Sequence, residues 1–297
     1  MTGAHYDEFG LFAENVAEHG LDVGAIPEVS RVSVPLDGGR AISALRWGAG
    51  APRAVLVHGG GQNAHTWDTV ALALGTPVLA PDLPGHGHSD WRDDARYEIE
   101  SMADDLAVAI SRHAPAAEVL VGMSLGGLTS LALAVRHPDL VRRLVLVDIT
   151  PGVTAEKAKV VTDFIDGPQT FASFDELLAR TVAHHPGRSE SSLRRGILHN
   201  ARPLGDGTWQ WRYDRRARRH DGEPRPPERL WSAVESLRCP VLLVRGSLSP
   251  VVDDADVAEL SRRNPSARTV VVHGAGHSIQ GDRPVELADI IRRDLEG

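Results

Sequence analysis

The residue of this 297-residue chain best placed for nucleophilic chemistry is a serine between glycines. Ser124 lies in the segment 122–127, Gly-Met-Ser-Leu-Gly-Gly, between an apolar run that predicts a strand and a pattern that predicts a helix over 125–136. A Gly-x-Ser-x-Gly sequence forms a tight strand-to-helix turn in which larger neighbours would clash. A chance match is conceivable in a chain with 29 glycines, but the strand and helix on either side make chance the weaker interpretation.

A second glycine-rich segment can supply the hydrogen-bond donors that acyl transfer requires. His58, Gly59, Gly60 and Gly61 follow one another at the end of an apolar run over 53–58. Acyl transfer needs two backbone N–H groups directed at the oxygen of the tetrahedral intermediate. We expect one from Gly60 and the other from Leu125, the residue after the nucleophile. Taken alone this segment would be a simple turn, but together with the serine motif it predicts an oxyanion hole. We also expect Gly59 and Gly61 to lie against the substrate, because glycine allows close approach of the backbone.

The general base is expected at His277. This residue is the last histidine in the chain and closes the segment 273–277, directly after an apolar run over 269–272 that predicts a strand. A base on a loop can reach the serine, whereas His273 is nearer the strand and is the weaker candidate.

Strands and helices that alternate along the chain predict the scaffold for these residues. Apolar runs predict strands, and these runs lie at 31–36, 41–47, 53–58, 77–81, 119–122, 144–147, 240–244 and 269–272. Such alternation with helices indicates a mostly parallel sheet, although the first two strands, joined by a tight turn, should be antiparallel. The rhythm stops between residues 151 and 234. We therefore expect a core over 1–150 with an N-terminal helical extension, an insertion over 151–234, and the rest of the core over 235–297.

Four segments together resemble the α/β-hydrolase superfamily over nearly the full chain. They are residues 58–61, 82–89, 122–127 and 274–277. The resemblance implies an α/β fold with an eight-stranded sheet, and it implies that 151–234 form a helical cap. It also implies a catalytic triad whose members follow the chain order serine, acid, histidine.

The acid of this triad departs from the pattern of most of the superfamily. The usual position follows the strand predicted at 240–244, and here it holds Ser249, which carries no charge to orient a histidine. The chain is instead similar to a subgroup of small esterases and lactone hydrolases whose acid follows the preceding strand, and this makes Asp148 the favoured acid. Asp253 and Asp254 are the alternative, although they could simply cap a helix. Asp148 also has a purely structural alternative, in which its carboxylate simply accepts hydrogen bonds from backbone N–H groups at the end of its strand.

Five further residues are candidates for substrate binding. His65 and Trp67 follow the glycine-rich loop and either line the pocket or pack in the first turn of a helix. Trp209, Trp211 and Tyr213 alternate with polar residues in the insertion. They either form an apolar ceiling over the substrate or make up the core of the insertion, which we slightly favour.

We expect no metal ion and no cofactor. The segment 86–90, His-Gly-His-Ser-Asp, resembles the start of a binuclear metal site, but Trp91 stands where that motif has histidine. A basic run in the insertion could bind a carboxylate or phosphate, but a solvated segment is the better interpretation. Its members are Arg212, Arg215, Arg216, Arg218 and Arg219.

Composition limits the remaining possibilities. A net charge of −8 argues against a nucleic-acid partner, which would select a basic surface. Cys239 is the only cysteine, so the chain can form no internal disulfide. The first ten residues do not resemble a secretory signal and there is no long apolar run, so we expect a cytoplasmic protein that does not bind membranes. The oligomeric state is left open.

The sequence therefore predicts a serine hydrolase acting on a small-molecule carboxylic ester or lactone through an acyl-enzyme intermediate. Two alternatives stay open. One is a carbon–carbon bond hydrolase on the same fold, and the other is a slow-turnover ligand-binding or signalling protein that keeps the triad.

Overall fold

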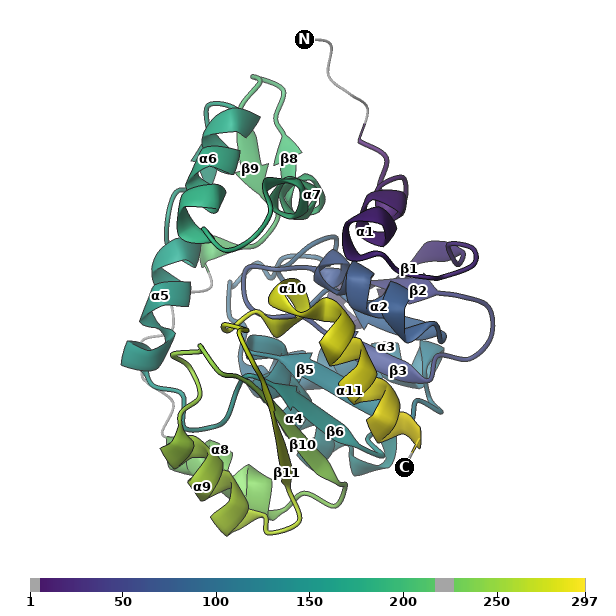
Figure 1. Ribbon diagram of the computed structural model, residues 1–297, viewed down its shortest axis with the longest axis vertical. Coiled ribbons are helices and arrows are strands. Elements are labelled where there is room, and N and C mark those ends of the chain that lie inside the picture. Colours follow the sequence, from purple (N-terminus) through teal and green to yellow (C-terminus); the bar gives the residue numbers. More distant parts are fainter. Residues whose placement is uncertain (1–5, 217–226, 297) are drawn as a thin grey trace.

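A mostly parallel sheet of eight strands forms the centre of the molecule (Figure 1). The computed structural model describes residues 6–216 and 227–296. Along the sheet the order is β1-β2-β4-β3-β5-β6-β10-β11; β2 pairs antiparallel with β1 and β4, and the other neighbours are parallel. The bounds are β1 (Val29–Pro35), β2 (Ala41–Trp47), β3 (Ala54–Val57), β4 (Val78–Pro81), β5 (Val119–Met123), β6 (Leu144–Val147), β10 (Val241–Gly246) and β11 (Arg268–Val272). This confirms the predicted sheet and its antiparallel first pair.

Helices cover both faces of this sheet, which explains why its central strands are apolar on both sides. In β3, for example, Val55 and Val57 pack in one core and Ala54 and Leu56 in the other. One face carries α1 (Phe12–His19), α2 (Asp68–Leu74) and α11 (Pro284–Glu296). The opposite face carries α3 (Ile99–His113), α4 (Leu125–Arg136), α8 (Pro227–Glu235) and α9 (Asp254–Arg263). In the described ranges, no helix has the length and hydrophobicity needed to cross a bilayer.

A smaller unit with its own core stands apart from the large sheet, at the top left of Figure 1. It contains α5 (Ala155–Ile165), α6 (Phe174–His184), α7 (Glu190–Asn200) and a small antiparallel sheet in the order β7-β9-β8. The strands are β7 (Thr170–Phe171), β8 (Ala201–Pro203) and β9 (Trp209–Trp211), and none joins the large sheet. The sequence predicted a helical cap here and showed no clear strand. Strands of two or three residues are too short to show an alternating pattern, so this sheet escaped the sequence analysis.

The last helix of the predicted insertion belongs with the core. Trp231 and Val234 of α8 are buried in the same cluster as the side chains of α3 and α4, and α8 packs against α4 and α9. We therefore place the end of the smaller unit before α8, rather than at residue 234.

The start of α9 generates a prediction about stability. The Asp253 carboxylate accepts the Asp256 amide hydrogen at 2.9 Å, and the Asp256 carboxylate accepts the Asp253 amide hydrogen at 3.0 Å, which is a reciprocal helix cap. Asp253→Ala should lower the free energy of unfolding by about 1 kcal/mol, measured by urea denaturation. Asp254→Ala, which alters the exposed neighbour, is the control and should change it by less than about 0.5 kcal/mol. Equal effects of the two substitutions would contradict this assignment.

Candidate active site

Ser124 lies in a strained turn between β5 and α4. Its backbone has φ 51° and ψ −119°, a conformation that a residue with a side chain seldom adopts. The turn is possible because its neighbours lack side chains: a Cβ at Gly122 would lie 2.5 Å from the Gly126 carbonyl oxygen, and a Cβ at Gly126 would clash with the His58 carbonyl. The turn places Ser124 at the N-terminus of α4, where the helix favours developing negative charge.

Asp148 follows the adjacent strand β6 and is also held at a positive φ, of 50°. Its amide donates to the Val244 carbonyl of β10 at 2.8 Å, which brings the residue to the carboxyl end of that strand. Its fully buried carboxylate accepts hydrogen bonds from the Gly246 amide at 2.9 Å and from the Ser249 hydroxyl. The Asp148 carboxylate, which follows β6, thus lies beside Ser249 at the end of β10. This is the position at which most of the superfamily has the acid of the triad.

The imidazole of His277 contacts this carboxylate. His277 Nδ1 lies 2.8 Å from Asp148 Oδ2. Because an ionised carboxylate only accepts hydrogen bonds, Nδ1 carries the proton and Nε2 is left with its lone pair. The alternative acids are engaged elsewhere: Asp253 caps α9 and pairs with Lys157 at 2.9 Å, and Asp254 pairs with Arg245.

The glycine-rich loop after β3 is held by a buried histidine whose tautomer can be assigned. His58 Nε2 accepts the Leu83 amide hydrogen at 2.9 Å, so Nδ1 must carry the proton, and it donates to the Gly59 carbonyl at 2.7 Å. Burial, aided by neighbouring His86, lowers the pKa of His58 to about 3, which keeps the ring neutral. The Gly60 amide makes no hydrogen bond to any described residue. Leu125 begins α4, where the first N–H groups lack intrahelical partners.

A cavity of about 310 Å³ brings these groups together. Ser124, His277, Gly60 and Leu125 all line it. Most of its remaining wall is apolar and comes from Leu128, Ile149, Val153, Ala158, Val161, Ile165 and Val251. Several of these belong to α5, and residues 213–215 close another side, so the smaller unit contributes part of the cavity wall. An apolar chamber with a few convergent polar groups is typical of a small-molecule site.

Comparison with known proteins identifies the family of the chain. Residues 52–284 match the α/β-hydrolase fold family. The chain is 48% identical to the esterase Rv0045c of Mycobacterium tuberculosis, over all of this chain and 97% of that protein. A solved structure of that esterase, reported with its inhibition by transition metals, superposes with a TM-score of 0.88 at 47% identity, covering 99% of this chain and 100% of the other. The chain is also 29% identical to a 2-(acetamidomethylene)succinate hydrolase of Mesorhizobium japonicum, over 85% of this chain and 91% of that protein.

The chain belongs to the α/β-hydrolase fold family. It is accordingly an enzyme of a hydrolase family, and the expected superfamily is confirmed.

Four residues expected at the substrate pocket of this α/β-hydrolase lie elsewhere. Trp67 is fully buried in the core beneath the sheet face that α2 covers. Trp211 is buried in the core of the smaller unit, and Trp209 packs edge-on against Phe174. His65 lines a different cavity, which does not include Ser124. His65 and Trp67 lie on the helical turn Ala64–Trp67, and neither lines the cavity at Ser124.

The glycines and the basic run also have assigned places. Gly61 lines the cavity of Ser124. At Gly59 a Cβ would lie 2.5 Å from Met123 Sδ, so this glycine allows close packing rather than substrate contact. Arg215 donates to the Asp166 carbonyl at 2.7 Å and Arg216 pairs with Asp214 at 2.9 Å. The backbone carbonyl of Arg212 accepts a hydrogen bond from the Trp91 indole N–H at 3.2 Å, whereas Arg218 and Arg219 lie outside the described residues.

Sequence reasoning missed part of the cavity wall. Tyr97 and Tyr213 both line the cavity and lie on segments far apart in the chain. Tyr213 was expected beside Trp209 and Trp211 as part of an apolar ceiling, whereas no pattern in the sequence marks Tyr97. Tyr97 donates to Asp214 at 2.8 Å, and this contact forms only when the two units pack together.

The convergence of donors on Asp148 predicts the effect of removing its charge. Asp148→Asn should lower kcat for an activated ester such as p-nitrophenyl acetate by up to about 10⁴-fold, because an amide can favour the wrong histidine tautomer. Combining it with Ser249→Asp should restore part of the loss, since the new carboxylate would lie beside the same imidazole. Near-normal turnover in Asp148→Asn, or no recovery in the folded double variant, would contradict this arrangement.

Proposed function

We propose that this chain is a serine esterase acting on small carboxylic esters, including lactones. The observation that carries the proposal is the 2.8 Å contact between His277 and Asp148 at a cavity shared with the strained Ser124. The similarity to a mycobacterial esterase over the whole chain supports it.

In the first half-reaction Ser124 Oγ attacks the carbonyl carbon of the ester and its proton passes to His277 Nε2. The carbonyl oxygen becomes an oxyanion, which the N–H groups of Gly60 and Leu125 stabilise. Asp148 holds the imidazolium by its Nδ1–H. When the intermediate collapses, the bond to the alcohol oxygen breaks and His277 returns the proton to that oxygen, so an alcohol leaves and an acyl-serine remains.

In the second half-reaction a water molecule gives its proton to His277 Nε2 and attacks the acyl-serine. The same two N–H groups stabilise the second oxyanion. Collapse breaks the bond to Ser124 Oγ, which recovers the proton from His277, and the carboxylic acid leaves. A lactone follows the same course, except that the alcohol stays tethered to the acyl group.

The cavity wall supports an apolar substrate. Leu128, Val161 and Val251 offer no charge to a substrate beside Ser124. An acyl or alkyl chain can therefore bury its surface there. The polar part of the lining comes from His86, Tyr97, Thr162, Tyr213, Asp214 and Arg215, and Tyr97 donates a hydrogen bond to Asp214.

A carbon–carbon bond hydrolase or a slow-turnover binding protein would share the fold. Product analysis with a panel of esters, lactones and diketones distinguishes a carbon–carbon bond hydrolase from an esterase, because ester cleavage releases an alcohol. Sustained multiple turnover on an ester distinguishes an esterase from a slow-turnover binding protein.

Ser124 should be essential to this chemistry. Ser124→Ala should reduce kcat on p-nitrophenyl esters by at least ~10³-fold while leaving the fold intact, because nucleophile and base act as a unit. A fluorophosphonate should label the unaltered protein once, at Ser124, in peptides analysed by mass spectrometry. Efficient hydrolysis by folded Ser124→Ala would overturn the proposal.

The cap helix α5 should help determine acyl-chain length. Val161 lines the cavity, whereas its neighbour Val160 is 58% exposed on the same helix. Val161→Trp should fill the chamber and lower kcat/KM for a hexanoyl ester relative to an acetyl ester by at least about tenfold, since a small misfit in an apolar pocket has effects of this order.

Val160→Trp is the matched control and should leave the ratio unchanged. An unaltered ratio in Val161→Trp would show that the acyl group does not bind against α5.

A further inference from the structure

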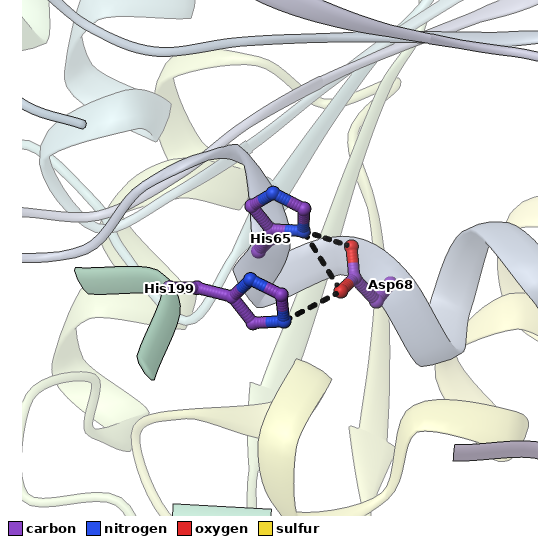
Figure 2. Close-up of side chains that lie close together, drawn as sticks. All are labelled: His65, Asp68 and His199. Atoms are coloured by element: carbon purple, nitrogen blue, oxygen red, sulfur yellow. Dashed lines mark hydrogen bonds and ion pairs between the residues drawn. The ribbon is translucent and has the colours of Figure 1, made fainter. Parts of the chain in front are cut away.

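A second group of polar side chains lies buried outside the proposed active site. His65 and Asp68 come from the segment that follows the glycine-rich loop, and His199 comes from the end of α7 in the smaller unit (Figure 2). One potential ligand atom from each residue lies within 4.8 Å of the other two. All three side chains are buried, so this junction between the two units is polar at its centre.

The inward-facing atoms are those that a metal ion would use once the His199 ring turns. The rings of His65 and His199 are stacked with their planes 9° apart, so a rotation of the His199 ring about its Cβ–Cγ bond is needed for both lone pairs to point at one ion. His65 Nδ1 lies 3.0 Å from Asp68 Oδ2, and His199 Nε2 lies 3.6 Å from the same oxygen. Ligand atoms bound at about 2.0–2.1 Å in a tetrahedral zinc site lie roughly 3.3 Å apart, and the two observed distances bracket this value. A cavity of about 160 Å³ lined by all three residues leaves room for a water ligand.

The outward-facing nitrogens have the partners typical of ligand histidines. His65 Nε2 lies 3.0 Å from the Glu8 carboxylate, and His199 Nδ1 lies 2.7 Å from the Tyr6 hydroxyl. Arg31 also pairs with Glu8 and holds that carboxylate in place. A carboxylate or other oxygen on the far nitrogen orients a ligand imidazole and directs its lone pair at the metal.

A protonated His65 held between Asp68 and Glu8 is the competing explanation. Burial alone would lower the pKa of His65, but the Asp68 charge and the hydrogen bonds to Asp68 and Glu8 outweigh it and raise the pKa to about 9. The His199 ring stacks on that of His65, with centroids 3.8 Å apart, but this stacking and the ion pair do not satisfy its Nε2. His199 is 3% exposed, and its Nε2 makes no hydrogen bond to any residue in the described ranges.

We propose that His65, Asp68 and His199 bind a divalent transition-metal ion, for which zinc is the best match. Two imidazoles and one carboxylate form a donor set that zinc accepts, and the same imidazoles could hold cobalt or nickel. The metal and the proton on His65 would compete for one lone pair. The sequence showed no signal for this site, because its ligands come from two units and lack a ligand-spacing motif.

This site would join the cap to the loop that carries Gly60. Asn63 Nδ2 donates to the His199 carbonyl at 3.0 Å, and Asn200 Nδ2 donates to the Gly61 carbonyl at 2.6 Å. An ion bound by His199 of the cap and by His65 and Asp68 of the core would add a third link at the same junction. The bound ion should therefore stabilise the docked arrangement of the two units.

The test is a titration of chelator-treated full-length protein with Co²⁺ and then Zn²⁺. Co²⁺ should produce visible absorption bands that saturate at one equivalent, and Zn²⁺ should abolish them. Zinc at about a hundred times its Kd should raise Tm by about 5 °C. His199→Gln should eliminate the bands and the shift, and Glu8→Gln should weaken zinc binding by about 10- to 100-fold.

Two controls separate this site from others. His137 pairs with Asp104 at 2.8 Å on the surface, so His137→Gln tests binding to an ordinary histidine–carboxylate pair and should bind zinc normally. His277→Gln removes the imidazole of the proposed triad and should also bind normally, so the metal site is tested independently of the esterase proposal.

The proposal is overturned if the unaltered protein shows no saturable cobalt bands, or if His199→Gln binds as well as the unaltered protein. Loss of binding in His137→Gln or His277→Gln, with His199→Gln unaffected, would place the ion elsewhere and overturn it equally. If His199→Gln does not fold, Tyr6→Phe replaces it, because Tyr6 touches only the outer nitrogen of the same ring. A folded Tyr6→Phe variant with unchanged affinity would then contradict the proposal.

Discussion

The buried carboxylate of Asp148 is the group on which the geometry of the proposed active site depends. A charge in the interior is costly unless it is fully hydrogen-bonded, and here a backbone amide, a hydroxyl and an imidazole all donate to it. Gly246 and Ser249 belong to β10 and its following loop, whereas His277 follows β11. One carboxylate therefore ties together the ends of three strands, and its positive φ is the conformational cost of reaching across from β6.

The proposed acid can follow β6 instead of β10 because the two strands are paired. β6 and β10 are parallel and in register through Leu146 and Val147, so their carboxyl ends lie at the same edge of the sheet. A carboxylate at the end of either strand can approach the same imidazole. Ser249, at the position where most of the superfamily has the acid, instead donates to Asp148 and fixes its orientation, and its Oγ also accepts the Val251 amide hydrogen at 3.1 Å.

The smaller unit contributes to two separate places. Its helix α5 and residues 213–215 form one side of the cavity at Ser124. Its helix α7 brings His199 and Asn200 against the loop after β3. Both contacts reach the loop that carries Gly60 and Gly61: Ile165 of α5 lies beside these glycines, and Asn200 donates to the Gly61 carbonyl. Any movement of the smaller unit would therefore change both the shape of the cavity and the support of the proposed oxyanion donors. The proposed metal ion would act at the second contact, away from the proposed triad.

Local patterns in the sequence determined the large sheet, most of its helices and the segments that carry Ser124, Gly60 and His277. Each of these signals lies within about ten residues, where apolar periodicity and glycine placement are sufficient. The sequence limited the choice of the proposed acid to Asp148 or the Asp253–Asp254 pair. It did not decide between them, because chain order alone does not say which carboxylate reaches the imidazole. The tertiary structure decided what depends on contacts between distant segments: the small β7-β9-β8 sheet, the place of α8 in the core, the walls of the cavity, and the meeting of His65, Asp68 and His199. Such contacts leave no periodic trace in the chain, since packing alone brings their residues together.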